Sequence, residues 1–340
     1  MKEPIRHTKE SIECYCKKIG LDTKLVQGAG GNVSWKDQDT LWIKASGEWL
    51  AEASKKDIFL PIDLKHLKDS IKRSDFDVIP KVLSKTKLRP SIETLFHAVM
   101  PHRVVLHLHP IVPLSYLVRK DCFQMIKKKI NPSLHWSLIK YEKPGSLLAQ
   151  EISKEMIRKP KTDILFLQNH GIIIGGKNIN EIDIIFKGLI SDLNEDNHLN
   201  FSLNNKVENL LLDSNMELIS VDIPKIHNLV FNNFLYENLK KSWALYPDHV
   251  VFLGHKAHCY DSLEILMEKK VPLAELIFIK NRGVFTTSKM SLAKLVQLKC
   301  YYDVITRQRE EIELNLLSEN NIIELLNWDA EHYRQKIAKK

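Results

Sequence analysis

Hydrophobic residues along this chain alternate between short unbroken runs and positions spaced three or four apart. The unbroken runs are rich in β-branched residues and predict buried strands, whereas the helical spacing predicts amphipathic helices. The expected strands lie around residue 35 and at 42–43, 58–62, 104–110, 135–141, 164–167 and 172–174, and the expected helices at 10–19, from 63 onward, 93–100, 113–118, 146–157 and 180–197. Short strands that alternate with helices are typical of a layered α/β domain.

Polar residues, asparagine above all, dominate residues 194–205 and interrupt this pattern. Such a composition is typical of a linker or an excursion from the fold. From about residue 221 the pattern resumes, with an expected helix at 228–243, a strand at 276–279 and a long helix at 290–317. The sequence therefore predicts a first domain over residues 1–205 and a C-terminal α/β extension over residues 206–340 that packs on it.

Candidate chemistry is concentrated at the ends of two expected strands. The period of two along residues 104–110 puts His107 and His109 on one face, and Glu93 opens the helix just before that strand. His170 follows the strand at 164–167. A pair of buried histidines alone can be ordinary core residues, but a third histidine favours a metal site. Three histidines leave one coordination position open, which is typical of a catalytic zinc site.

Residues 27–34, QGAGGNVS, contain three of the chain's 12 glycines. Glycine permits positive φ angles and close approach, so such a loop can surround an anion with backbone N–H groups. A hairpin turn is the alternative interpretation. The stretch has neither the GxGxxG pattern of dinucleotide-binding loops nor the GK[ST] ending of nucleotide-phosphate loops.

Five short motifs occur in the order and spacing of the class II aldolase/adducin family, which the chain resembles over roughly residues 8–200. The motifs are GAGGNVS at 28–34, ASG at 45–47, SIE at 91–93, HLHP at 107–110 and NHG at 169–171. The segments 41–47 and 90–110 look more like the aldolase half of bifunctional rhamnulose-phosphate aldolase/alcohol dehydrogenase proteins. The resemblance implies a three-layer α/β/α fold with a central, mainly antiparallel sheet, and a homo-oligomer, which is a tetramer in the relatives.

The resemblance also implies roles for individual residues. His107, His109 and His170 would hold Zn²⁺ or another divalent metal, and Glu93 would transfer a proton during the reaction. Residues at the family's positions for substrate and phosphate binding are Gly31, Asn32, Ser46, Gly47 and Ser91.

Ile92 departs from the pattern of many single-activity aldolases, which have a second hydroxyl residue before the catalytic glutamate. One possible phosphate donor is therefore missing. Lys44 could compensate with a positive charge beside a phosphate or a carboxylate, or it could be an ordinary solvated lysine. In the relatives a tyrosine from a neighbouring subunit protonates the leaving aldehyde. The candidates for that role in this chain are Tyr116, Tyr141 and Tyr246.

The expected function is that of a metal-dependent aldolase, a lyase that cleaves a ketose or ketose phosphate through a zinc-stabilised enediolate. An epimerase, dehydratase or decarboxylase of a sugar phosphate could use the same scaffold, because the fold alone does not determine the reaction. A third interpretation is a non-enzymatic, adducin-like binding protein. Such a protein would not need Glu93 together with three histidines.

Composition adds few constraints. The formal net charge of +8 suits a small anionic substrate, and no recognition helix or basic aromatic stretch supports nucleic-acid binding. Five cysteines without a CxxC pair predict reduced thiols. The sequence shows no signal-peptide segment and no apolar run of membrane-spanning length, so we expect a cytoplasmic protein without membrane contact. Four further residues could form a second metal cluster: Asp248, His249, His255 and His258. No third motif of ligand spacing lies nearby, so we expect them at the surface or an interface instead.

Overall fold

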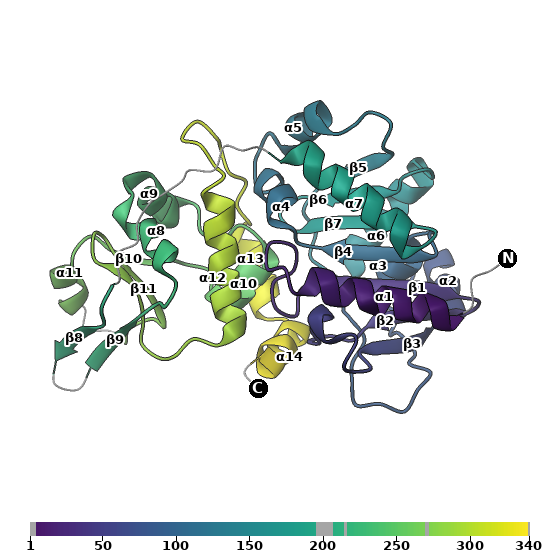
Figure 1. The fold of residues 1–340 in the computed structure, drawn as a ribbon, viewed down its shortest axis with the longest axis horizontal. Coiled ribbons are helices and arrows are strands. Elements are labelled where there is room, and N and C mark those ends of the chain that lie inside the picture. The colour runs from purple at the N-terminus through teal and green to yellow at the C-terminus, as the bar shows by residue number, and fades with distance from the viewer. Residues whose placement is uncertain (1–4, 195–206, 214–215, 269–271, 339–340) are drawn as a thin grey trace.

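A computed structural model describes residues 5–194, 207–213, 216–268 and 272–338. Two sheets lie on either side of helix α12 (Leu292–Ile305), as Figure 1 shows. Residues 195–205 of the expected linker lie outside the described residues. Within the described ranges, no helix combines the length and the apolar character that crossing a membrane requires.

The larger sheet has seven strands, and every neighbouring pair is antiparallel except β5 and β6. This arrangement confirms the expected central, mainly antiparallel sheet. The strands in spatial order are β3 (Phe59–Asp63), β2 (Thr40–Lys44), β1 (Asn32–Asp37), β4 (Val104–Leu108), β7 (Gly171–Gly176), β6 (Ile164–Leu167) and β5 (Trp136–Ile139). Strands β4, β6 and β7 are buried at every position, because helices cover both faces of the sheet.

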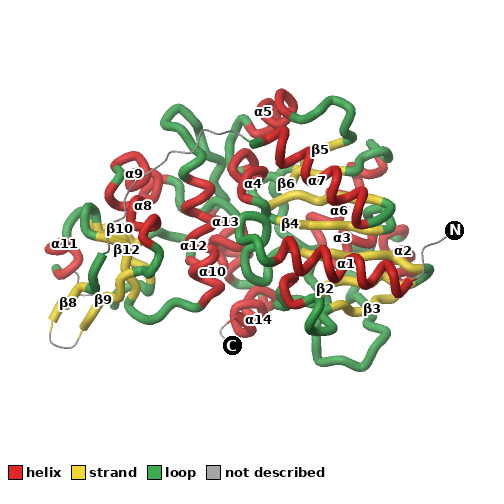
Figure 2. Tube along the Cα trace, in the orientation of Figure 1, coloured by secondary structure: helices red, strands yellow, loops and turns green. Residues whose placement is uncertain are grey.

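Helices on the two faces complete three layers, α/β/α (Figure 2). The first face is covered by α1 (Ile5–Gly20), α4 (Ile111–Leu117), α5 (Cys122–Lys129) and α7 (Ile179–Leu193). The second face is covered by α2 (Leu64–Lys72), α3 (Thr94–Val99) and α6 (Ser146–Arg158). Asp63 starts α2 by accepting a hydrogen bond from the backbone N–H of His66, the usual role of an N-cap aspartate. Helix α1 begins five residues earlier than expected.

The C-terminal extension contains the smaller sheet, which confirms the expected α/β character of this region. Its five strands, in spatial order, are β10 (His258–Tyr260), β11 (Leu276–Ile279), β12 (Gly283–Thr286), β9 (Met216–Ser220) and β8 (Leu210–Asp213). Besides α12, its helices are α8 (Asn228–Phe231), α9 (Asn233–Lys241), α10 (Pro247–Leu253), α11 (Leu263–Met267), α13 (Glu319–Leu326) and α14 (Asp329–Ala338). The extension also contains the short 3-10 helix η2 (Pro224–His227), and a second 3-10 helix, η1 (Leu50–Glu52), lies in the first part of the described chain.

Two expected helices of the extension are wrong in extent. The segment 228–243 forms two helices because Asn232 adopts an extended conformation and its side chain caps the second one. The segment 290–317 is helical only through α12. Beyond α12 the chain runs alongside the end of α4, where the backbone N–H of Asn315 donates to the carbonyl of Val118. This long-range contact overrides the local helical pattern.

Helix α4 packs into both halves of the molecule. Leu117 belongs to the core under the larger sheet, whereas Leu114 and Val118 belong to the core of the extension. Gln308, just after α12, donates a hydrogen bond to the carbonyl of Ser115 at 2.9 Å. The extension is therefore packed directly against the region where β4 ends.

Candidate metal centre and active site

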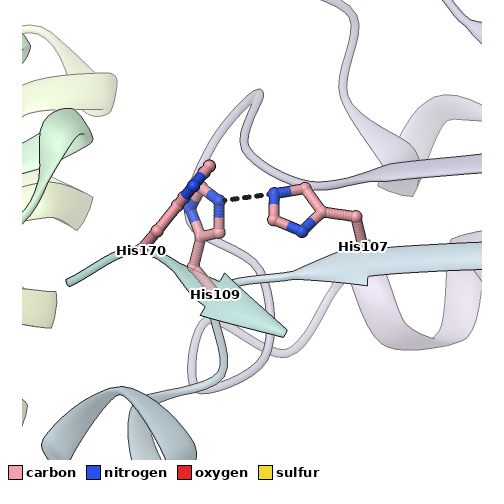
Figure 3. Close-up of side chains that lie close together, drawn as sticks. All are labelled: His107, His109 and His170. Atoms are coloured by element: carbon pink, nitrogen blue, oxygen red, sulfur yellow. Dashed lines mark hydrogen bonds between the residues drawn. The ribbon is translucent and has the colours of Figure 1, made fainter. Parts of the chain in front are cut away.

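Three histidines meet where β4 ends beside the turn between β6 and β7. His107 lies in β4, His109 follows that strand directly, and His170 lies in the turn (Figure 3). Strands β4 and β7 are antiparallel neighbours, so the two ligand-bearing segments are adjacent. All three side chains are buried, and one ring nitrogen of each lies within 4.8 Å of the other two.

Hydrogen bonds at Nδ1 determine which ring nitrogens face one another. His107 Nδ1 lies 2.9 Å from the carbonyl oxygen of Ile172, and His109 Nδ1 lies 3.2 Å from Oδ2 of Asp248. Both partners are acceptors, so the Nδ1-protonated tautomer of each ring, the form that leaves Nε2 open to a metal, lets Nδ1 donate to its partner. The two Nε2 atoms, which are 3.0 Å apart, then both present lone pairs. Two acceptors cannot hydrogen-bond to each other, whereas a cation shared between them satisfies both.

His170 completes this donor set. Burial lowers its pKa to about 4, although a hydrogen bond with Glu93 acts in the opposite direction. The neutral imidazole is thus the stable form near neutral pH, and it is the form that binds metals. The three residues therefore fit a divalent cation held by imidazole nitrogens.

Glu93 stands at the start of α3 and points into the same centre. Its Oε1 lies 3.3 Å from His107 Nε2 and 3.2 Å from His170 Nε2, and Asn32 Nδ2 donates to its Oε2 at 2.6 Å. Burial raises the pKa of this carboxyl, but the two histidines outweigh burial and hold the pKa well below its usual range. A buried carboxylate therefore stands beside the candidate metal position.

The glycine loop connects α1 to β1 and lies across the end of β4, so the hairpin interpretation is wrong. Gly31 has a φ of 70°, and a Cβ atom there would lie 2.9 Å from the carbonyl oxygen of His107. Both the positive φ and this close approach require glycine. Asn32, the next residue, pairs with His107 across the two strands.

Lys44 is fully buried, so the interpretation as a solvated lysine is wrong. Its Nζ donates to the carbonyls of Ala29 at 3.0 Å and Glu48 at 2.6 Å. The ammonium thus ties the glycine loop to the SG turn at Ser46 and Gly47. Burial lowers the pKa of Lys44 to about 7.

The structure brings all the predicted site residues together. The pocket at the centre is lined by Gly31, Asn32, Lys44, Ser46, Gly47, Ser91, Glu93, His109 and His170. His107 is not among the lining residues, but its Nε2 lies 3.0 Å from Nε2 of His109. The cavity volume is about 30 Å³, which is room for about two water molecules.

The extension supplies residues to this pocket that the sequence pattern did not indicate: Pro247, Asp248, Glu331 and Arg334. Asp248 Oδ1 accepts a hydrogen bond from the guanidinium of Arg334 at 2.8 Å. Burial raises the pKa of Asp248, but Arg334 and His109 outweigh burial and hold it well below the usual range. The expected surface or interface position of Asp248 is therefore wrong.

His249 is also buried, against the expectation of a surface position, and it does not join the metal centre. Its ring packs against Trp243 and Tyr301, with centroid distances of 4.3 Å and 4.8 Å. Burial lowers its pKa to about 3. His255 and His258 are exposed, as expected.

Among the described residues, no tyrosine lines the pocket. The Tyr116 hydroxyl donates to the carbonyl of Leu193, and Tyr246 is almost fully buried. Tyr141 is half-buried. Its hydroxyl oxygen is buried, so none of the three candidates presents its hydroxyl at the surface of one copy of the chain.

The fold and the site together define an α/β/α protein with a three-histidine candidate metal centre beside a buried glutamate. The family model for the Class II Aldolase and Adducin N-terminal domain matches residues 10–182, more than half of the chain. The chain therefore belongs to this family, which confirms the resemblance found in its motifs.

Known proteins that are similar to this chain match about half of its length. The chain is 27% identical over 175 residues to an uncharacterized oxidoreductase, YuxG, of Bacillus subtilis; the match covers 47% of this chain and 25% of YuxG. The N-terminal class II aldolase domain of a conserved Thermoplasma acidophilum protein is 22% identical, with a TM-score of 0.48 over 57% of this chain and 95% of that one. A sugar-phosphate aldolase of Thermotoga maritima is 18% identical, with a TM-score of 0.43 over 56% and 94%.

Proposed function

We propose that this protein is a metal-dependent lyase that cleaves a carbon–carbon bond of a ketose or ketose phosphate. The observation that carries the proposal is the convergence of three imidazole nitrogens and the Glu93 carboxylate on one buried centre. Class II aldolases use a divalent metal, and members of this family are mostly enzymes. A site built only to bind a partner would not need a buried, charged glutamate against two metal ligands.

His107, His109 and His170 would hold the metal, for which Zn²⁺ is the best match to an all-imidazole donor set. When bound, the cation supplies Lewis-acid stabilisation of the negative charge that develops next to the substrate carbonyl. The protein fixes the ring orientations in advance through the Nδ1 hydrogen bonds to Ile172 and Asp248. Preorganised ligands lower the cost of reaching the transition state.

Glu93 is positioned to hold and move the proton. Its Oε2 is anchored by Asn32, while Oε1 faces the metal position. The carboxylate form can accept a proton from a substrate hydroxyl as that carbon becomes the aldehyde and the carbon–carbon bond breaks, and it can then give the proton to the carbon from which the aldehyde left. Burial keeps bulk water from competing for the proton.

The glycine loop, the SG turn and Ser91 form the part of the pocket suited to an anionic group. Gly47 has a φ of 81°, the backbone conformation in which successive N–H groups can point toward one anion. Lys44 has its donors occupied by carbonyls, so its contribution to a phosphate or carboxylate is its charge alone. We assign the phosphate or carboxylate of the substrate to this end of the pocket.

The tyrosine that the resemblance implies is expected from a second copy of the chain, because within the described residues no tyrosine lines the pocket. We therefore propose a homo-oligomer in which the site is completed across the interface. Light scattering on the purified protein should show more than one copy per particle. A monomer with full activity would refute this part of the proposal.

The first experiment is metal analysis by mass spectrometry, paired with a screen of ketose phosphates for aldehyde release with and without a chelator. One equivalent of zinc and chelator-sensitive cleavage would support the lyase. Zinc without cleavage would favour epimerisation, dehydration or decarboxylation on the same scaffold. A protein that binds no metal would refute the proposal and favour a binding role.

The Glu93→Gln variant tests the proposed proton transfer. It should keep its metal and its fold while turnover falls by about 10²-fold or more, the usual scale for lost general acid–base catalysis. Glu155→Gln is a matched control, because Glu155 is a largely buried glutamate on α6 that pairs with Arg158 outside the pocket. Full activity in Glu93→Gln would exclude Glu93 from proton transfer.

A further inference from the structure

The two ligand-bearing segments around the candidate metal centre are both held by the C-terminal extension. The family match ends at residue 182, so these contacts come from outside the matched domain. One contact joins His109 to Asp248 on α10, and the other joins Asn169, the residue before His170, to Asn315. In each contact the two partners lie far apart in the sequence and meet only in the folded chain.

Asp248 is the acceptor for the Nδ1 proton of His109, at 3.2 Å. Its other oxygen, Oδ1, accepts from Arg334 on α14 at 2.8 Å, and Arg334 also pairs with both carboxylate oxygens of Glu331 at 2.9 Å. The side chain of Asp248 is only 3% exposed. A buried carboxylate is costly unless it is paired, and Arg334 together with His109 provides that pairing.

Asn169 occupies the turn at a φ of 54°, a conformation that asparagine tolerates better than most residues. Its Nδ2 donates to the carbonyls of Leu245 at 2.8 Å and Asn315 at 2.7 Å, and its Oδ1 accepts from Asn315 Nδ2 at 2.7 Å. Asn169 is fully buried. These three bonds to the extension fix the backbone from which the His170 side chain projects.

A hydrogen bond at the far nitrogen of a metal-binding histidine fixes the tautomer, holds the ring in place and makes the ligand more basic. The carboxylate of Asp248 stands in that relation to His109. The Asn169 contacts do not touch the His170 ring; they hold the backbone from which the His170 side chain extends.

We propose that the C-terminal extension is an integral part of the metal centre, in which Asp248 and Asn315 are positioning residues for His109 and His170. This inference rests on the proposed metal site. It assigns a role to residues 206–340 that goes beyond covering the first domain: without Asp248, the His109 ring loses the partner that presents Nε2 to the metal.

The test is a Co²⁺ titration of the chelator-stripped full-length protein against a competing chelator, because Co²⁺ reports its ligands through its visible absorption. Asp248→Asn should weaken Co²⁺ binding by about 10–100-fold, the usual effect of losing such a partner, and shift the absorption bands. Asn315→Ala should weaken binding as well.

Asp303→Asn is the matched control, since Asp303 is a largely buried aspartate of the extension that pairs with Lys225 at 2.6 Å. Its Co²⁺ affinity and spectrum should equal those of the wild type. Circular dichroism verifies that each variant is folded. Wild-type affinity and an unchanged spectrum in folded Asp248→Asn would overturn the inference.

A second measurement needs no variant. Nitrogen-15 NMR of the histidine rings in the Zn²⁺-loaded wild type should show His109 protonated at Nδ1 and metal-bound at Nε2. Metal bound at Nδ1 of His109 would overturn the inference even if Asp248→Asn failed to fold. Wild-type protein that binds neither metal would remove the proposed function as well, whereas wild-type binding with an indifferent Asp248→Asn variant would remove only the role of the extension.

Discussion

Lys44 places an ionisable group in the buried interior of the candidate site, and its titration can be measured. The Nζ atom donates to backbone carbonyls on both sides of the pocket, and burial lowers its pKa from the ordinary 10.5 to about 7. The carbonyls favour the ammonium, and burial favours the neutral amine. The Lys44→Met variant keeps the apolar stem and removes the titration.

The sign of the effect follows from the two pKa values. Between about pH 7 and pH 10.5 the unfolded chain keeps the Lys44 proton and the folded chain has released it, so the free energy of unfolding rises with pH. The slope is about 1.4 kcal/mol per pH unit, and the full shift corresponds to about 5 kcal/mol. Below pH 7 both states are protonated and this contribution to the slope disappears.

Urea unfolding of the wild type and of Lys44→Met at pH 7, 8 and 9 gives the comparison. The difference between their free energies of unfolding should grow in favour of the wild type by about 1 kcal/mol from pH 7 to 8 and by about 1.3 kcal/mol from pH 8 to 9. Lost hydrogen bonds shift the variant at every pH and do not alter this slope. Lys256 is exposed, so the free energy of unfolding of Lys256→Met should change with pH as it does in the wild type. Parallel curves for Lys44→Met would refute the lowered pKa.

Two further predictions concern packing around the pocket. Gly171→Ala would place a Cβ atom 2.7 Å from Cδ2 of His109, so β7 must shift from β4; we expect a loss of about 1–3 kcal/mol in urea unfolding and weaker Co²⁺ binding. An unchanged unfolding midpoint would contradict this tight contact. Ile337→Ala removes the apolar side chain that α14 places beside Gly47, and hydrogen exchange should quicken within α14. Slow exchange in that variant would show that other contacts hold α14.

Much of the site could be predicted because its residues belong to short motifs on regular elements. The period of two along β4 predicts that His107 and His109 share one face, and the turn after β6 puts His170 at the end of a strand. Strand β4 ends at Leu108, yet the local geometry continues far enough for His109 to join the centre. The family resemblance then supplied the sheet type, which periodicity alone does not determine.

Asp248 and Arg334 could not be predicted in the same way. Asp248 sits after Pro247 in the first turn of α10, where an acidic residue is common simply because it suits the helix dipole. Arg334 lies on a helix that carries no motif. Asp248 contacts His109, which lies 139 residues earlier in the chain. Arg334 contacts Asp248, which lies 86 residues earlier. A local sequence pattern does not indicate which distant residues will form such pairs.

The charges that line the pocket connect the two proposed functions of the site, metal binding and anion binding. Glu93, Asp248 and Glu331 bring negative charge, and Lys44 and Arg334 bring positive charge. The carboxylates outnumber the basic groups, and Lys44 loses its charge as pH rises through about 7. Without a cation this pocket disfavours a phosphate or carboxylate, since like charges in a low-dielectric site repel strongly. A divalent ion at the three histidines would offset the excess, so the same ion that would polarise the substrate carbonyl in the proposed reaction would also make the site receptive to an anionic substrate.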